Sequence, residues 1–221
     1  MNEQSFISWE LKFIINNWEL MKNNTNNTRS EDKHQRIIKA ALKVFAKKGF
    51  YNSKVSEIAK EAEVADGTIY LYFKNKDDIL ISVFETEMKK MISNMKKELS
   101  TSQDPIEKVR IFAFQHLNMI TENQEWAEVA QVELRQSTKF MREYVKDHYA
   151  DYLNLFAYIV REGQEKGVFK EDINTGIAKR AFFGALDEMG RYWVLSRSKR
   201  YSVEESAKQI SDIFIKGVMN Q

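Results

Sequence analysis

The residues whose types and spacing suggest a specific chemistry lie between Val64 and Lys76. Within this run Thr68 offers a hydroxyl and a methyl group, Tyr70 and Tyr72 offer phenolic hydroxyls, and Lys76 offers a positive charge. A hydroxyl beside a methyl group suits the edge of a base, whereas phenols and ammonium groups suit phosphates. The run therefore predicts contact with nucleic acid.

The sequence lacks the residue constellations that are typical of a catalytic site. His34, His116 and His148 are dispersed, and none pairs with another at the four-residue spacing that holds a metal on a helix. There is no glycine-rich phosphate loop and no Cys, hence no thiol nucleophile and no disulfide framework. We expect no catalytic residues, no metal and no cofactor, and the absence of Cys fits a cytoplasmic protein.

Two short helices joined by a tight turn are predicted around the run. In residues 53–62, Ser53 suits the N-cap of a helix, and Val55 and Ile58 begin an apolar stripe at helical spacing. A break at 63–65 precedes a second short helix. This is the helix-turn-helix pattern, in which the N-terminal residues of the second helix lie at base edges in the major groove.

The expected DNA contacts come from both helices and from the residues that follow them. Gly67 lets the backbone approach a ligand closely because it has no side chain. Between Arg29 and Lys76 there are eleven Lys and Arg against six Asp and Glu, although the whole chain carries only +2, so this segment is locally basic. The full set of expected contacts is Lys54, Ser56, Gly67, Thr68, Tyr70, Tyr72 and Lys76.

The run from Ile37 to Lys76 resembles the DNA-binding domain of the TetR family of transcriptional regulators, most closely in G-T-I-Y-L-Y-F-K-N-K at 67–76. The resemblance implies an all-α repressor with an N-terminal three-helix helix-turn-helix domain and a C-terminal helical ligand-binding and dimerisation domain. Ala65 and Asp66 replace the Ser and Lys of many members, so the usual backbone contact there is in doubt. Asp66 suits either the positive end of the helix dipole or a cytosine N4 group.

Residues 1–28 are expected to lie outside the fold, with 29–75 forming the DNA-binding domain and 76–221 the ligand-binding and dimerisation domain. Trp9 to Trp18 form an apolar patch too short to span a bilayer, so no membrane association is expected. Either translation starts at Met21, or the extension is disordered or forms an extra helix that packs on the DNA-binding head or on a partner.

Capping residues and apolar spacing predict the remaining helices. The first follows Ser30 and ends at Gly49, and a long helix runs from Asn75 to Leu99. The proline at position 105 marks the next boundary. Asp172 or Asn174 and Ser202 are the expected caps of the last two of five further helices, which we place at 105–121, 124–137, 139–166, 173–197 and 203–219.

Bulky apolar residues in these five helices predict either a filled core or a core with a cavity for a large apolar ligand. The runs at 132–137 and 184–188 are similar to the TetR-type repressors of fatty-acid degradation in Gram-positive bacteria. That resemblance implies long-chain acyl-CoA as the effector. Arg135 is the candidate for its phosphates, or else a surface ion-pair residue. The expected ligand contacts are Phe112, Leu117, Arg135, Leu155, Phe156 and Phe183.

The helices at 173–197 and 203–219 are expected to form a homodimer that reads a palindromic operator, as the family resemblance implies. Small residues such as Gly184 and Ala185 allow close approach in the first, and Ile213, Phe214 and Val218 supply apolar contacts in the second. Two alternatives stay open. One is a TetR-type repressor induced by another hydrophobic ligand or drug that controls an efflux or lipid gene. The other is a lipid-binding or enzymatic helical protein with a decayed DNA-binding head.

Overall fold

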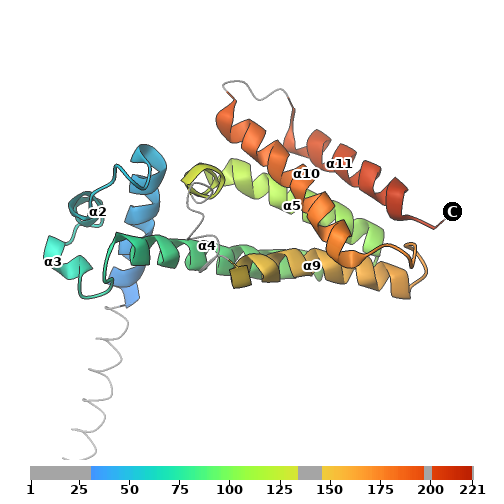
Figure 1. Ribbon diagram of the computed structural model, residues 1–221, viewed down its shortest axis with the longest axis horizontal. Coiled ribbons are helices and arrows are strands. Elements are labelled where there is room, and N and C mark those ends of the chain that lie inside the picture. The colour runs from blue at the N-terminus through green and yellow to red at the C-terminus, as the bar shows by residue number, and fades with distance from the viewer. Residues whose placement is uncertain (1–30, 134–145, 197–200, 221) are drawn as a thin grey trace, which may run out of the picture.

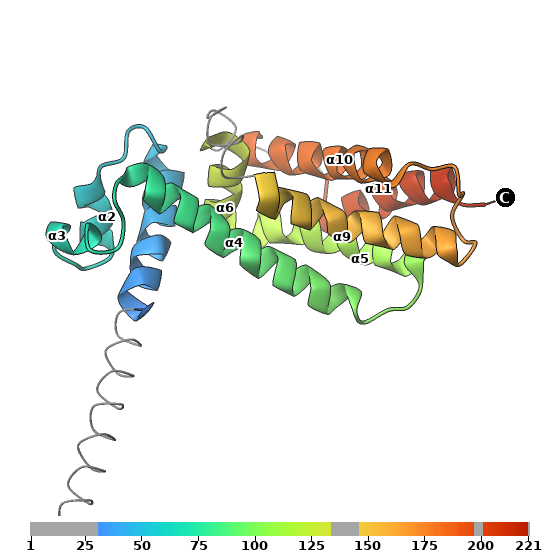
Figure 2. The same cartoon turned by 60° about the horizontal axis from the view of Figure 1, so that its bottom comes forward.

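The computed structural model describes residues 31–133, 146–196 and 201–220, and this part of the chain is helical without a strand. The expectations for 1–28 and for Arg135 lie outside the described residues. A small head and an elongated helical body are joined by one long helix, α4 (Lys76–Leu99), as Figures 1 and 2 show. The predicted all-α class is confirmed for the described residues.

The head consists of a helix at 31–48, α2 (Val55–Glu61) and α3 (Asp66–Ile69). Apolar residues at helical spacing, including Ile37 and Phe45, are fully buried and form its core. Gly49 ends the first helix in the left-handed region, with φ of 78°, and its N–H donates to the Phe45 carbonyl at 2.9 Å. The predicted end of this helix is confirmed.

The predicted N-cap of α2 is wrong by one residue. Lys54 is the N-cap, and its N–H donates to the Glu57 carboxylate at 3.0 Å. Ser53 is instead buried, and its hydroxyl donates to the Gly49 carbonyl at 2.6 Å. The hydroxyl therefore closes the preceding turn, and the capping role passes to the side chain of Glu57.

The long helix α4 begins where the sequence predicts. The Asn75 side chain caps it by accepting from the Asp78 N–H at 2.8 Å, and the Asp78 carboxylate accepts from the Lys74 N–H at 3.0 Å. Its buried face then passes from the head into the body, where α4 packs on α5 and α9. A displacement of α4 in the body would therefore also move the residues of the head that pack on it.

In the part of the body that the structure describes there are five α-helices, and α6 continues into a π-helical turn, η1. Their bounds are α5 (Pro105–Glu122), α6 (Gln124–Glu128), η1 (Val129–Glu133), α9 (Lys146–Glu165), α10 (Thr175–Leu195) and α11 (Val203–Val218). The predicted single α-helix at 124–137 is thus wrong from Val129 to Glu133. A π-helical turn contains an extra residue, and the spacing of apolar residues in the sequence does not reveal it. Asn174 and Ser202 cap α10 and α11 as predicted.

Aromatic rings fill the body between α5, α9, α10 and α11. Phe112 and Phe156 meet edge to face at 5.2 Å between centroids, and Phe156 stacks on Phe182 at 4.2 Å. Phe169 is fully buried, and its ring lies against Gly163, where a side chain would overlap it. The glycine is therefore required by packing.

We expect Gly163→Ala to lower the free energy of unfolding by about 1–3 kcal/mol, because the new methyl group collides with the buried Phe169 ring. Chemical denaturation measures this. Gly67→Ala is the matched control, since nothing lies within 4 Å of the added methyl group and alanine favours a helix. Equal stability of the two variants would contradict the packing role of Gly163.

Candidate nucleic-acid interface and candidate ligand cavity

The α2–α3 unit lies on the side of the head that is away from the body (Figures 1 and 2). Tyr70 and Leu71 are 60% and 81% exposed, which is unusual for large apolar side chains without a partner. Lys54, Ser56 and Gly67 are also exposed, whereas Thr68 and Tyr72 are half-buried. The predicted contacts thus gather on one small unit that could enter a groove of DNA.

α3 itself is shorter than the sequence suggests. It ends at Ile69, and Tyr70 occupies its C-cap, so the phenol groups follow the helix rather than lie on it. Tyr72 is held by the first helix, where the His34 ring lies 6.0 Å from it and stacks on Phe73 at 4.9 Å. These rings fix the segment after α3 against the head.

Arg36, on the helix at 31–48, supports the α2–α3 unit, a role that the sequence did not predict. Its guanidinium donates to the Ala62 carbonyl at 2.6 Å, at the C-terminus of α2. The next residue, Glu63, adopts a positive φ of 54°, a conformation that non-glycine residues rarely take. The arginine therefore helps to hold the turn that sets the angle between α2 and α3, and nothing in its sequence context indicates that role.

The position of Lys76 differs from the expected phosphate contact. Its ammonium donates to the carbonyls of Phe50 at 2.7 Å, Ser53 at 2.9 Å and Tyr51 at 3.2 Å, and it lies 4.6 Å from the centre of the Phe50 ring. All three N–H groups of the ammonium are thus taken by the protein. This lysine fastens the start of α4 to the loop before α2, so its ammonium is directed at these carbonyls and away from a DNA phosphate.

An apolar cavity of about 460 Å³ lies in the body between α4, α5, α6, η1, α9 and α10. Of the ligand contacts predicted from the sequence, Phe183 lines it. The lining residues that prediction missed include Met88, Met91, Trp126 and Tyr149. The two methionines lie three residues apart on α4, and this spacing alone gives no indication that the helix face borders a cavity.

Four predicted ligand contacts lie elsewhere. Phe112, Leu117 and Phe156 are at most 1% exposed and belong to the filled aromatic core. Leu155 is half-buried and lines neither this cavity nor a second, more polar cleft beside it. The sequence could not place these residues relative to the cavity, because a bulky apolar residue has the same pattern in a filled and in a hollow part of a helical bundle.

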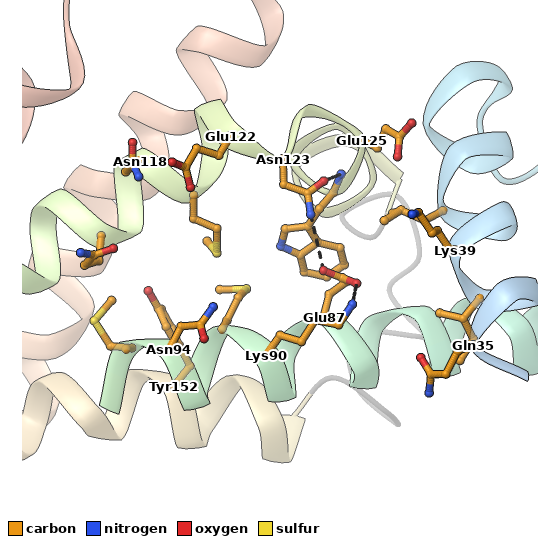
Figure 3. Close-up of a pocket in the computed structure, with 17 residues that line it drawn as sticks. Gln35, Lys39, Glu87, Lys90, Asn94, Asn118, Glu122, Asn123, Glu125 and Tyr152 are labelled. Carbon is orange, nitrogen blue, oxygen red and sulfur yellow. Dashed lines mark hydrogen bonds and ion pairs between the residues drawn. The ribbon is translucent and has the colours of Figure 1, made fainter. Parts of the chain in front are cut away.

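A more polar cleft of about 600 Å³ adjoins the cavity and reaches the head (Figure 3). Met91, Met119, Trp126 and Tyr152 line both spaces, so the two share a wall. On the other side the cleft is lined by residues of the helix at 31–48, from which Lys39 projects toward it in Figure 3. A ligand that fills both spaces would touch the body and the head together.

The charges that line the cleft are mixed. Three carboxylates, Glu87, Glu122 and Glu125, face two lysines. Lys90 is paired with Glu87 at 2.7 Å, whereas Lys39 makes no ion pair with another described residue. Lys39 is therefore the cation of the described lining that is available to an anionic group of a ligand.

His116 lies on the wall of the apolar cavity. Its Nδ1 is 2.9 Å from the Tyr152 hydroxyl. Burial lowers the pKa of His116 to about 4, and the negative charge of Asp187 opposes this effect only in part. The ring is therefore neutral at pH 7 and belongs to the polar part of an otherwise apolar wall.

The outer faces of α10 and α11 carry exposed small and apolar residues. Ile177 on α10 is 70% exposed, and Ile213 on α11 is 74% exposed. Gly184 and Ala185, farther along α10, are also exposed. Val218 differs from the sequence-based expectation, because it is only 6% exposed and packs inside its own chain. Within the described ranges, no helix combines the length and the apolar character needed to cross a membrane.

Two family models together match most of the chain. One, described as bacterial regulatory proteins, tetR family, matches residues 37–83, and the other, described as the C-terminal region of YsiA-like proteins, matches residues 84–217. The fatty acid metabolism regulator protein of Bacillus subtilis is 36% identical over 189 residues, which are 86% of this chain and 97% of that protein.

Solved structures agree with these matches. The transcriptional regulator FadR of Bacillus subtilis in complex with stearoyl-CoA superposes with a TM-score of 0.78 at 36% identity, covering 83% of this chain and 98% of that one. The fatty acid degradation regulator FadR of Bacillus halodurans gives 0.78 at 37% identity, covering 84% and 95%. The family expected from the sequence is confirmed.

We expect Lys76→Met to lower the free energy of unfolding by about 1–3 kcal/mol, because three carbonyls lose their charged donor. Thermal or chemical denaturation measures the loss. Lys74→Met serves as the control, since Lys74 is exposed and its side chain makes no hydrogen bond or ion pair to another described residue. If both variants were as stable as the parent chain, the fastening role of Lys76 would be wrong.

Proposed function

The chain belongs to the tetR family of bacterial regulatory proteins, and we propose that it represses fatty-acid degradation genes and leaves its operator when long-chain acyl-CoA binds. One observation carries the proposal: an apolar cavity shares a wall with a polar cleft that reaches the DNA-binding head. This shape fits a ligand with a long apolar tail and a large polar head group. The relative from Bacillus subtilis was solved with such a ligand.

The proposed DNA contacts are six of the seven residues expected from the sequence. Gly67 supports the assignment, because the protein itself leaves open space where its side chain would be. This open space leaves room for another molecule to approach the backbone closely. The set is Lys54, Ser56, Gly67, Thr68, Tyr70 and Tyr72, within a DNA-binding domain at 29–75 that acts in the cytoplasm.

The proposed operator is palindromic, because two copies of the chain pair through α10 and α11. The exposure of Ile177 on α10 and Ile213 on α11 supports this interface, since covering large exposed apolar side chains is stabilising. In such a dimer the two α3 segments would meet half-sites about 34 Å apart on one face of the DNA. A small rotation of either head would break that match.

Release of the operator then follows from the difference in the ligand's affinity for two arrangements of the protein. The cleft is bounded by the helix at 31–48 on one side and by α4, α5 and α6 on the other. Consider an arrangement in which the helix at 31–48 lies farther from the body. A ligand that binds this arrangement more tightly shifts the population toward it, and only that difference in affinity moves the equilibrium. Lys39 and, outside the described residues, Arg135 are the proposed partners of the CoA phosphates.

A second candidate is a repressor of the same family that responds to another hydrophobic ligand or drug. The carboxylates of Glu87, Glu122 and Glu125 favour it, because they would repel a phosphate-rich head group. The two candidates share the DNA-binding mechanism and differ only in the inducer.

The test is a titration of the protein, bound to DNA from upstream of its own gene, with acyl-CoAs of increasing length. We expect long-chain acyl-CoA to release the DNA, and free CoA and free fatty acid to leave it bound, because only the ester fills both spaces. Tight DNA binding that no acyl-CoA disturbs would favour the second candidate.

We expect Tyr70→Ala to weaken operator binding roughly tenfold to a hundredfold, because an exposed phenol is lost from the DNA-reading unit. Acyl-CoA binding by this variant should be unchanged. Tyr158→Ala is the control, since Tyr158 is 59% exposed on α9 in the body. Equal operator affinity of the two variants would remove Tyr70 from the interface.

A further inference from the structure

A second, smaller pocket of about 210 Å³ lies beside the apolar cavity, between α5, α6 and α10. Trp193 and Val194 of α10 line it, together with polar residues of α5 and α6. Ile120 and Ala127 line both spaces, so these two buried side chains form the partition between the cavity and the pocket. The partition therefore sets how far a ligand in the cavity can extend toward Trp193.

The order of residues along α10 shows where this partition lies. Asp187 lines the cavity, whereas Trp193 lines the pocket. Gly190 lies between them, about 4.5 Å along the helix axis from each, and it is buried. The pocket thus continues the cavity along α10, and the junction of the two spaces lies at the level of Gly190.

The Ile120 side chain crosses from α5 to α10 at this level. A Cβ atom at position 190 would overlap the Ile120 Cδ1 atom, so the isoleucine occupies the space that the glycine leaves empty. Ile120 is only 6% exposed. Because packed protein interiors yield little, an isoleucine that is seated on a glycine closes the passage between the two spaces.

The tail of the proposed ligand would approach the partition from the side of α4. The polar cleft shares residues of α4, α5, α6 and α9 with the cavity. Among the described residues, none of α10 lines the cleft and none of α4 lines the pocket. A tail that enters the cavity from the cleft therefore runs from α4 toward α10, where Ile120 lies.

We propose that Ile120, seated on Gly190, sets the longest acyl chain that the cavity accepts. A chain that ends before Ile120 gains affinity with each methylene group that it buries. A longer chain has to leave its extra carbons outside the cavity, where they gain nothing. The inference rests on the proposed function, because it takes the ligand to be a long-chain acyl-CoA, and it adds the residue that selects the length of the chain.

The experiment is calorimetric titration of the full chain, without DNA, with saturated acyl-CoAs that lengthen in steps of two carbons, at concentrations below micelle formation. We expect the affinity to rise roughly fourfold for each added methylene group up to one chain length, and to stop rising beyond it. That length is the limit that Ile120 sets.

Two variants test the role of Ile120. Ile120→Ala joins the pocket to the cavity, so the first ester beyond the parent's limit should gain roughly tenfold over the limiting ester. Ile120→Val removes only the methyl group that lies against Gly190, and it should shift the limit in the same direction at a smaller cost in stability. A cooperative thermal unfolding transition shows that each variant is folded.

Leu153→Ala is the matched control. It removes as many carbon atoms as Ile120→Ala from another buried residue of the same cavity, and Leu153 does not line the pocket. Its limit should remain that of the parent chain. An equal shift of the limit in Leu153→Ala and Ile120→Ala would show that any widening of the cavity lengthens the chain, and it would overturn the role of the partition.

The other outcomes separate this inference from the function on which it rests. An affinity that keeps rising along the whole series in the parent chain would overturn the limit and leave the acyl-CoA proposal standing. A limit that stays in place in the folded Ile120→Ala and Ile120→Val variants would have the same consequence. If the parent chain bound no acyl-CoA of any length, both the inference and the proposed function would be wrong.

Discussion

The arrangement of this protein depends on the way in which α4 is fastened to the DNA-binding head. The Lys76 ammonium holds three carbonyls of the loop before α2, and Asn75 caps the helix that begins beside it. Because α4 then continues into the body and packs on α5 and α9, one helix links the head with the part that contains the cavity. A charged donor on three carbonyls is a strong tether, so rotation of α4 turns the loop and α2 with it.

The second constraint is that the two spaces of the body share a wall while only one reaches the head. The apolar cavity can hold a chain without touching the helix at 31–48, and the polar cleft cannot be filled without touching it. An inducer that combines an apolar tail with a large polar head group would therefore gain affinity from the cavity and act on the head through the cleft. This division is the basis of the proposed response to long-chain acyl-CoA.

Local patterns predicted much of the fold, whereas tertiary geometry decided the site. The helix end at Gly49 and the caps at Asn75 and Ser202 depend on a few neighbouring residues and could be read from the sequence. The role of Lys76 could not, because its partners lie more than twenty residues away. Nor could sequence distinguish Phe112, in the filled core, from Phe183, on the cavity wall, since both are bulky residues on buried helix faces.

The most direct test of the coupling is a distance between the head and the body measured with and without ligand. The chain has no Cys, so Lys60→Cys in α2 and Asp151→Cys in α9, both exposed, would carry two spin labels, with labelled chains diluted into unlabelled ones. We expect long-chain acyl-CoA to shift this distance by several ångströms, and free CoA to leave it unchanged. An unchanged distance under conditions in which acyl-CoA releases the DNA would contradict the account.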